Sequence, residues 1–172
     1  MTMSDVRRLS NFISRTVSGP MWHGAALSEL LEGVSAQDAA SHPIKTAHSI
    51  WEIVHHMTAW TEIAIARLSD KRTGDPPSDV DWPPVTDFSD GAWREAKNHL
   101  FTGYRNLAEA AATIDLPRLQ KIIPGRDHSA QEMLHGLIEH GAYHGGQIAL
   151  LKRAIEFEAA TRETAEVREQ DD

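Results

Sequence analysis

Four long segments of the chain have apolar residues at helical spacing, and none alternates apolar and polar residues as a half-buried strand would. Two of the segments begin with a capping box, in which a serine hydroxyl and a glutamate carboxylate satisfy free backbone N–H groups. The pattern predicts an all-α fold, a four-helix bundle with at least one long crossover. The four segments run from about Ser4 to Val17, from Ser49 to about Leu68, from about Ser89 to Ile114, and from Ser129 past Leu151.

The connections between these segments differ in length. Residues 19–48 should hold a short helix near Ala25–Leu31 and a turn before Pro43. Residues 69–87 contain four prolines, one glycine and five aspartates, which predicts a long irregular loop. Such a loop in a compact domain is usually a lid, a crossover or a functional rim. Leu116-Pro117 marks the break before the last segment.

The 172 residues suit a single domain, which we place at residues 1–157. Between Glu156 and Asp172, seven acidic residues and two arginines carry −5 of the net charge of −8. We therefore expect residues 158–172 to form an acidic tail, a solvated helical extension that frays.

Composition excludes several classes of function. The acidic balance, 25 acidic against 17 basic side chains, argues against nucleic acid or an anionic membrane as partner. The absence of cysteine excludes disulfides, a thiolate nucleophile and Cys-based metal sites. No apolar run approaches a membrane span, and Met1–Asp5 does not resemble the start of a signal peptide, so we expect a cytoplasmic protein with a small-molecule substrate. The ten histidines are unusually many.

Helical geometry, ~100° per residue, selects the histidines that face the bundle interior. In the second long segment His56 falls on the shoulder of the apolar face, whereas His55 points to water. In the last segment His140 and His144 lie in the middle of the buried face, and His135 lies opposite. The i, i+4 spacing of that pair is the one used to chelate a metal ion from a single helix.

Each of these histidines could also have a purely structural role, since a lone inward-facing histidine is more often a hydrogen-bonded core residue than a metal ligand. Two stacked inward histidines are harder to explain, because each needs a buried partner. With His56 they would complete the three protein ligands of an open metal site. The residues alone leave the metal site and a metal-free core cluster as alternatives. Four glycines in the same segment indicate close helix approach or space near a site: Gly136, Gly141, Gly145 and Gly146.

The stretch from His140 through Tyr143, His144 and Gln147 to Ile148 resembles the last-helix signature of the DinB/YfiT-like superfamily of metalloenzymes. Ser49–Glu52 followed by His56 is similar to the second-helix motif of that family. The segments Trp22–Gly24 and Leu30–Ser35 resemble one branch of it, and the resemblance spans about Gly19 to Arg153.

The resemblance implies a four-helix bundle, often dimeric, that binds a divalent ion such as nickel, zinc, iron or manganese. Its three histidine ligands would map onto His56, His140 and His144, the residues that helical geometry also selects. The family usually has an apolar residue in place of His55, so the histidine doublet departs from its pattern, as does the acidic tail after Phe157. Such bundles commonly pair through an apolar helix face, and we expect a homodimer that uses Trp93 or Ile65 there.

Some relatives catalyse transfers or isomerisations with small-molecule thiols such as bacillithiol, mycothiol or glutathione. A three-histidine site suits that chemistry, because a metal lowers the pKa of a bound thiol or water. Since the chain has no cysteine, a thiolate would come from a cosubstrate. We therefore expect a metal-dependent transferase or hydrolase. The alternatives are a non-catalytic metal-binding or stress-related bundle and a metal-free bundle with core histidines.

Four further residues are candidates for the surroundings of the site. Gln147 and Tyr143 lie on or beside the ligand face and could contact a ligand or a bound water, although each also suits plain packing. Because His56 lies about two turns into its helix, the site should open toward residues 19–48. That places Trp22 and His23 within reach as pocket lining, with loop anchoring as the alternative for Trp22.

Overall fold

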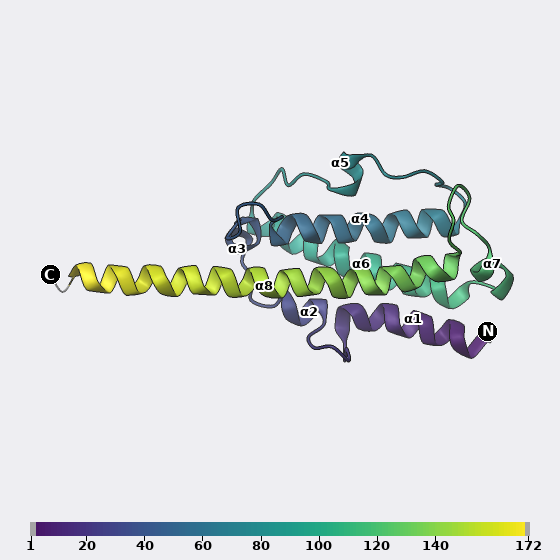
Figure 1. Cartoon of the computed structure of the whole chain (residues 1–172), viewed down its shortest axis with the longest axis horizontal. Helices are drawn as coiled ribbons and strands as arrows, with labels where there is room; N and C mark the ends of the chain where they lie inside the picture. Colours follow the sequence, from purple (N-terminus) through teal and green to yellow (C-terminus); the bar gives the residue numbers. More distant parts are fainter. Residues whose placement is uncertain (1–2, 171–172) are drawn as a thin grey trace.

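The computed structural model describes residues 3–170, and the side chains of residues 5–165. In this part of the chain there is no β-strand, and only two isolated bridges occur, Met21 with Gly24 and Ile122 with Ser129. The helices follow one another as α1 Met3–Ser18, α2 Leu27–Leu30, α3 Ala36–Ala40, α4 Ile50–Leu68, α5 Ser78–Asp81, α6 Asp90–Thr113, α7 Leu116–Gln120 and α8 Ala130–Gln170 (Figure 1).

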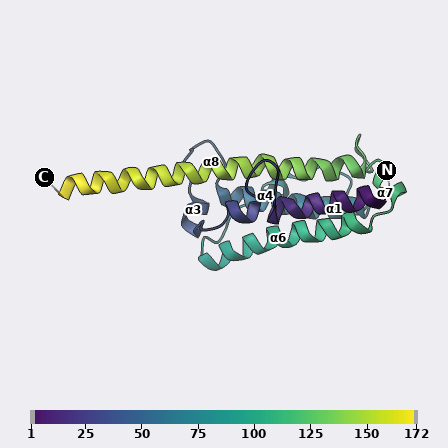
Figure 2. The same cartoon turned by 90° about the horizontal axis from the view of Figure 1, so that it is seen from below.

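The four long helices form the bundle. Helix α1 packs on α6 and α8, and α4 packs on the same two, so the four enclose one core (Figures 1 and 2). The all-α fold is thus confirmed, and the packing of the long helices is compatible with the expected four-helix bundle. Both capping boxes are present, with Glu52 N–H donating to Ser49 and Glu132 N–H donating to Ser129, each at 3.2 Å. Their glutamates in turn accept from the serine N–H groups.

Three short helices, α3, α5 and α7, were not anticipated by the pattern. Helix α3 begins at Ser35, whose hydroxyl accepts from the N–H of Asp38, and α7 begins at Asp115, whose carboxylate accepts from the N–H of Arg118. The expected break at Leu116-Pro117 is therefore the first turn of α7, where a proline costs no hydrogen bond.

The core includes a stripe of buried residues along α6. Trp93 is 3% exposed and its indole N–H donates to the carbonyl of Val34 at 2.8 Å. Trp93 therefore lies inside the core, and the expectation that it offers a dimer face is wrong. Ile65 is also partly buried against the core. The stripe is Trp93, Leu100, Tyr104 and Leu107, all buried.

Glycines set the distances between the long helices. A Cβ at Gly141 of α8 would overlap the methyl group of Thr16 on α1, and one at Gly145 would lie 3.3 Å from Leu30. By contrast, a Cβ at Gly136 or Gly146 would have no neighbour within 4 Å. Gly141 and Gly145 therefore allow close packing, whereas Gly136 and Gly146 lie beside open space.

Helix α8 continues well beyond the other helices, as the yellow end in Figure 1 shows. Leu151 is the last buried residue among the side chains described up to residue 165, and Phe157 is 73% exposed. The segment expected as an acidic tail is helical through Gln170, where the described chain ends. None of the described helices is both long and apolar enough to cross a membrane.

Candidate metal centre

Three imidazoles meet in the seam between α4 and α8. His56 comes from α4, and His140 and His144 come from successive turns of α8. The Nε2 atom of His140 lies 3.0 Å from Nε2 of His56 and 3.1 Å from Nε2 of His144. One ligand atom from each ring lies within 4.8 Å of the others, so the three residues selected in the sequence form one cluster.

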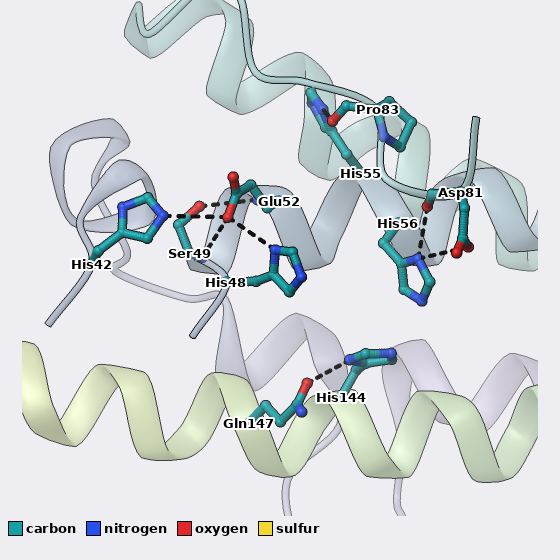
Figure 3. Close-up of polar contacts among 10 residues, drawn as sticks. All are labelled: His42, His48, Ser49, Glu52, His55, His56, Asp81, Pro83, His144 and Gln147. Carbon is teal, nitrogen blue, oxygen red and sulfur yellow. Dashed lines mark hydrogen bonds and ion pairs between the residues drawn. The ribbon is translucent and has the colours of Figure 1, made fainter. Parts of the chain in front are cut away.

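The outer nitrogens of two rings are held by acceptors. His56 Nδ1 donates to the backbone carbonyl of Asp81 at 2.7 Å and lies 3.2 Å from the Asp81 carboxylate. His144 Nδ1 donates to Oε1 of Gln147 at 2.6 Å. Figure 3 shows both contacts. Because these protons sit on Nδ1, the Nε2 lone pairs of His56 and His144 face the cluster.

Burial keeps the three rings neutral at pH 7. Removal from water, followed by the neighbouring histidines, lowers the pKa of His140 to about 3. Burial also lowers the pKa of His144 to about 4, although Gln147 opposes the shift. The pKa of His56 is lowered by burial as well, against the opposing effect of Asp81. Nδ1 of His140 is buried and has no hydrogen-bond partner in the part of the chain that the structure describes.

An aromatic stack covers the cluster. The indole of Trp82 lies parallel to the His56 ring at 3.9 Å, and the His48 ring lies on the other face of Trp82 at 3.6 Å. His48 is held in turn by the capping carboxylate of Glu52, at 3.3 Å (Figure 3). Glu52, which caps α4, therefore also holds His48 in the aromatic stack that covers the site.

Asp81 and Trp82 were not identified as site residues in the sequence. Both belong to the connection over residues 69–89 between α4 and α6. The proline and aspartate content of residues 69–87 predicted a lid, a crossover or a functional rim there. The short helix α5 ends at Asp81 and brings both residues onto His56. A tryptophan followed by two prolines inside a polar loop was the available signal.

A cavity of about 540 Å³ opens on one side of the cluster. Tyr143 and Gln147, both expected near the site, line it. It reaches residues 44–48, the end of the connection that leads into α4. The remaining walls are mainly apolar and include Ile44, Ile53, Leu150 and Leu151.

Trp22 and His23 are not brought to the site. They occupy the tip of the turn closed by the Met21–Gly24 bridge, where Trp22 is 98% exposed, and neither lines a cavity beside the histidines. A local turn directs both side chains outward, which residue spacing alone could not reveal.

A second cavity, of about 450 Å³, lies on the other side of His56 and His140. The open space at Gly136 belongs to it. Two arginines from different elements reach it, Arg67 at the end of α4 and Arg126 in the loop before α8. The sequence analysis did not select either arginine.

His55 is placed differently from the expectation that it points to water. Its Nδ1 donates to the carbonyl of Pro83 at 3.3 Å, and its Nε2 accepts from the indole N–H of Trp51 at 3.0 Å. The loop after α5 thus covers the face of α4 that helical geometry assigned to solvent (Figure 3). Of the two adjacent histidines, His56 belongs to the cluster and His55 does not.

The donor set fits a metal ion. In a tetrahedral zinc site with Zn–N bonds of ~2.0–2.1 Å, neighbouring ligand nitrogens lie ~3.3 Å apart, close to the separations here. Neutral imidazoles with fixed tautomers are ligands for zinc, iron, nickel and copper. The described residues therefore offer three nitrogen ligands and a cavity beside them.

Comparison with known families gave one result. A family model described as the DinB superfamily matches residues 22–148, a range that includes all three histidines of the cluster. Searches of curated proteins and of solved structures gave no match.

Proposed function

We propose, from the premise that this chain belongs to the DinB superfamily, that it is a metal-dependent enzyme whose His56, His140 and His144 hold one divalent ion. The observation that carries the proposal is the convergence of three imidazole Nε2 atoms at the wall of a cavity of about 540 Å³. Two neighbouring acceptors support it, because Asp81 and Gln147 keep protons off the converging atoms of His56 and His144.

The proposed reaction is a small-thiol-dependent transfer or a hydrolysis. A bound divalent ion lowers the pKa of a coordinated thiol or water and so supplies a nucleophile at neutral pH. The chain contributes no thiol of its own, since it has no cysteine. Trp82 shields one face of His56 from water, and the apolar walls of the cavity suit a small organic substrate.

The donor set narrows the choice among nickel, zinc, iron and manganese. All three donors are imidazoles, and no carboxylate belongs to the cluster in the described chain. Imidazole suits zinc, iron and nickel, whereas manganese prefers oxygen ligands. We therefore propose nickel, zinc or iron before manganese.

Elemental analysis of the protein purified without a His-tag tests the metal. We expect about one divalent ion per chain in the wild type and none in His56→Ala or His144→Ala. His135→Ala is the matched control, because His135 lies on the exposed face of the same helix as His144. Wild-type protein that takes up no nickel, zinc, iron or manganese would exclude the proposal and leave the histidines as core residues.

Cobalt-loaded protein then separates an enzyme from a non-catalytic metal-binding bundle. An enzyme needs a coordination position open to ligands, so we expect the visible spectrum of bound cobalt to change when glutathione or azide is added. A spectrum that neither compound changes would indicate a closed fourth position, in favour of the non-catalytic alternative.

A homodimer is part of the proposal. Tyr143, Leu150 and Phe157 follow one another at seven-residue intervals on α8 and are 65%, 61% and 73% exposed. Residues seven apart share a helix face, so a second copy of the chain would cover these side chains. Sedimentation equilibrium should give twice the chain mass for the wild type and the chain mass for Leu150→Glu. A monomeric wild type would exclude the dimer without affecting the metal proposal.

A further inference from the structure

The cavity of about 450 Å³ contains a buried cation that lacks a counter-ion. Arg67 is 3% exposed, yet no carboxylate of the described chain lies within ion-pair distance of it. Its Nη2 donates to the carbonyl of Gly74 at 3.2 Å, and its Nε is buried without a hydrogen-bond partner. A buried charge without a partner is costly, so this arrangement is unusual for a purely structural arginine.

Arg118, in the same region, also has one buried guanidinium nitrogen without a hydrogen-bond partner in the described chain, but unlike Arg67 it has a counter-ion. Its guanidinium donates to the carbonyls of Arg67 and Leu68, where α4 ends, and pairs with Asp70 at 2.8 Å. These contacts stabilise the C-terminus of α4. The backbone carbonyl of Arg67 belongs to that network, whereas the Arg67 side chain lies along the cavity wall, over the ring of Trp60.

A second arginine reaches the same cavity. Arg126 pairs with Asp75 at 2.6 Å, and its Nε is also buried without a partner. The Asp75 side chain is 79% exposed, so this carboxylate approaches Arg126 from the solvent side. Burial, reinforced by the nearby Arg126, lowers the pKa of Arg67 below its ordinary value. An anion between the two guanidinium groups would relieve both the repulsion and the missing hydrogen bonds.

Trp60 connects the arginines to the histidines. The guanidinium carbon of Arg67 lies 5.4 Å from the indole centroid, and the ring of His140 lies 6.0 Å from the Trp60 ring. Arg67, Trp60, Gly136 and His140 all line the same cavity. A small molecule held by Arg67 can therefore extend along Trp60 to the three-histidine cluster.

We propose that Arg67 and Arg126 bind an oxyanion group of the substrate, a carboxylate or a phosphate, and so orient its reacting end toward His140. The orienting role rests on the proposed function, whereas the anion site itself does not. The substrate is then an organic acid or an organic phosphate. Its charged group occupies the arginine cavity, and its other end reaches the three-histidine cluster.

Calorimetric titration of the full chain with inorganic phosphate and with succinate tests the anion site. Ionic strength is kept constant with potassium chloride, so that screening of surface charges does not change. Metal is removed beforehand with a chelating resin, because soluble chelators are themselves polycarboxylates that would compete for the site. The anion that binds more tightly assigns the group as phosphate or carboxylate.

Three variants are expected to change the affinity for the anion, two of them downward and one upward. Arg126→Gln and Arg67→Met should each weaken binding by about 10-fold or more, because each removes a charged hydrogen-bond donor. Asp75→Asn should tighten binding several-fold, since it removes the carboxylate that competes for Arg126. Arg153→Gln on the exposed surface of α8 is the charge-matched control and should bind as the wild type does.

The proposal is overturned if neither anion binds, or if Arg126→Gln and Asp75→Asn bind as the wild type does. The Arg126 and Asp75 variants are sufficient to test the anion site even if Arg67→Met does not fold. The same titration is repeated on His140→Ala, which lacks one of the three proposed metal ligands. It tests whether the anion site is independent of the metal site. Anion binding without metal uptake in the wild type would contradict the proposed function alone, and metal uptake without anion binding would contradict the arginine site alone.

Discussion

Helix α4 packs against α6 on one side and α8 on the other, and the two seams are built differently. In the α4–α6 seam Gly103 admits Thr61, and the rings of Trp51 and Trp93 lie 5.1 Å apart. In the α4–α8 seam three imidazoles meet, with cavities of about 540 and 450 Å³ on either side. One seam is filled with close contacts, whereas the other leaves space around polar groups.

The difference separates stability from chemistry within one bundle. Neutral imidazoles, an orphaned His140 Nδ1 and an unpaired Arg67 all destabilise the α4–α8 seam. Close apolar packing elsewhere must offset that cost, because a folded domain is only marginally stable. A substitution in the α4–α6 seam should therefore lower the stability of the fold. A substitution in the α4–α8 seam should instead weaken metal binding or raise stability.

The largest effect of a single substitution is expected in the closed seam. Gly103→Val places a branched side chain against the buried Thr61, and overpacking of this kind costs about 3 kcal/mol. The Tm should fall by roughly 6–12 °C in thermal denaturation. Gly146→Val is the control, because its Cβ position is open, and it should change the Tm far less. Equal effects at the two glycines would contradict the distinction between the seams.

Acid should destabilise the metal-free protein through the open seam. The pKa values of His140 and His144, about 3 and 4, lie below the ordinary value of 6.5, so the unfolded chain binds protons first as the pH falls. Stability is therefore full above pH 6.5 and decreases toward pH 4, by about 2 kcal/mol per such histidine at pH 5.

Urea denaturation at pH 7.5 and at pH 5 measures this loss. His140→Ala should show a shallower pH dependence than the wild type, whereas His135→Ala on the exposed face should keep the full dependence. A wild type as stable at pH 5 as at pH 7.5 would mean that the cluster is not desolvated.

Removing an outer hydrogen bond should weaken metal binding without abolishing it. Gln147→Leu leaves His144 Nδ1 without its acceptor, so the ring is no longer held in one tautomer and orientation. Metal affinity, measured by competition with a chromophoric chelator, should fall by about 10-fold or more. Glu139→Gln, on the exposed side of the same helix, should leave the affinity unchanged.

The smallest effect has the opposite sign. Gly136→Ala adds a methyl group that meets no neighbour within 4 Å and improves helix propensity, so it should stabilise the protein by about 0.5–1 kcal/mol. Thermal denaturation of the metal-free protein measures the gain. A loss of stability there would show that the second cavity is narrower than the structure has it.

The sequence was sufficient for what depends on local periodicity. Capping boxes and helical spacing placed the four long helices, and the same geometry turned His56, His140 and His144 inward. Arg67 could have been found in the same way, because ~100° per residue places it between His56 and Trp60 on α4. A charged residue at that position was a signal that went unused.

The rest depends on contacts between distant segments. Asp81 and Trp82 reach His56 only because the loop over residues 69–89 folds back across α4, and that loop has no periodicity to interpret. The same loop covers His55, and a local turn directs Trp22 outward. Helical geometry assigns the faces of a helix but does not identify the loop that lies on each face.

The extension of α8 changes how the molecule moves through solution. The 41 residues of this helix span ~60 Å at 1.5 Å per residue, and no side chain described between residues 152 and 165 is buried. A body with such a rod has a larger frictional coefficient than a sphere of equal mass. A single chain therefore elutes early from a gel-filtration column, as a compact pair would, and only a method that reports mass directly distinguishes the two.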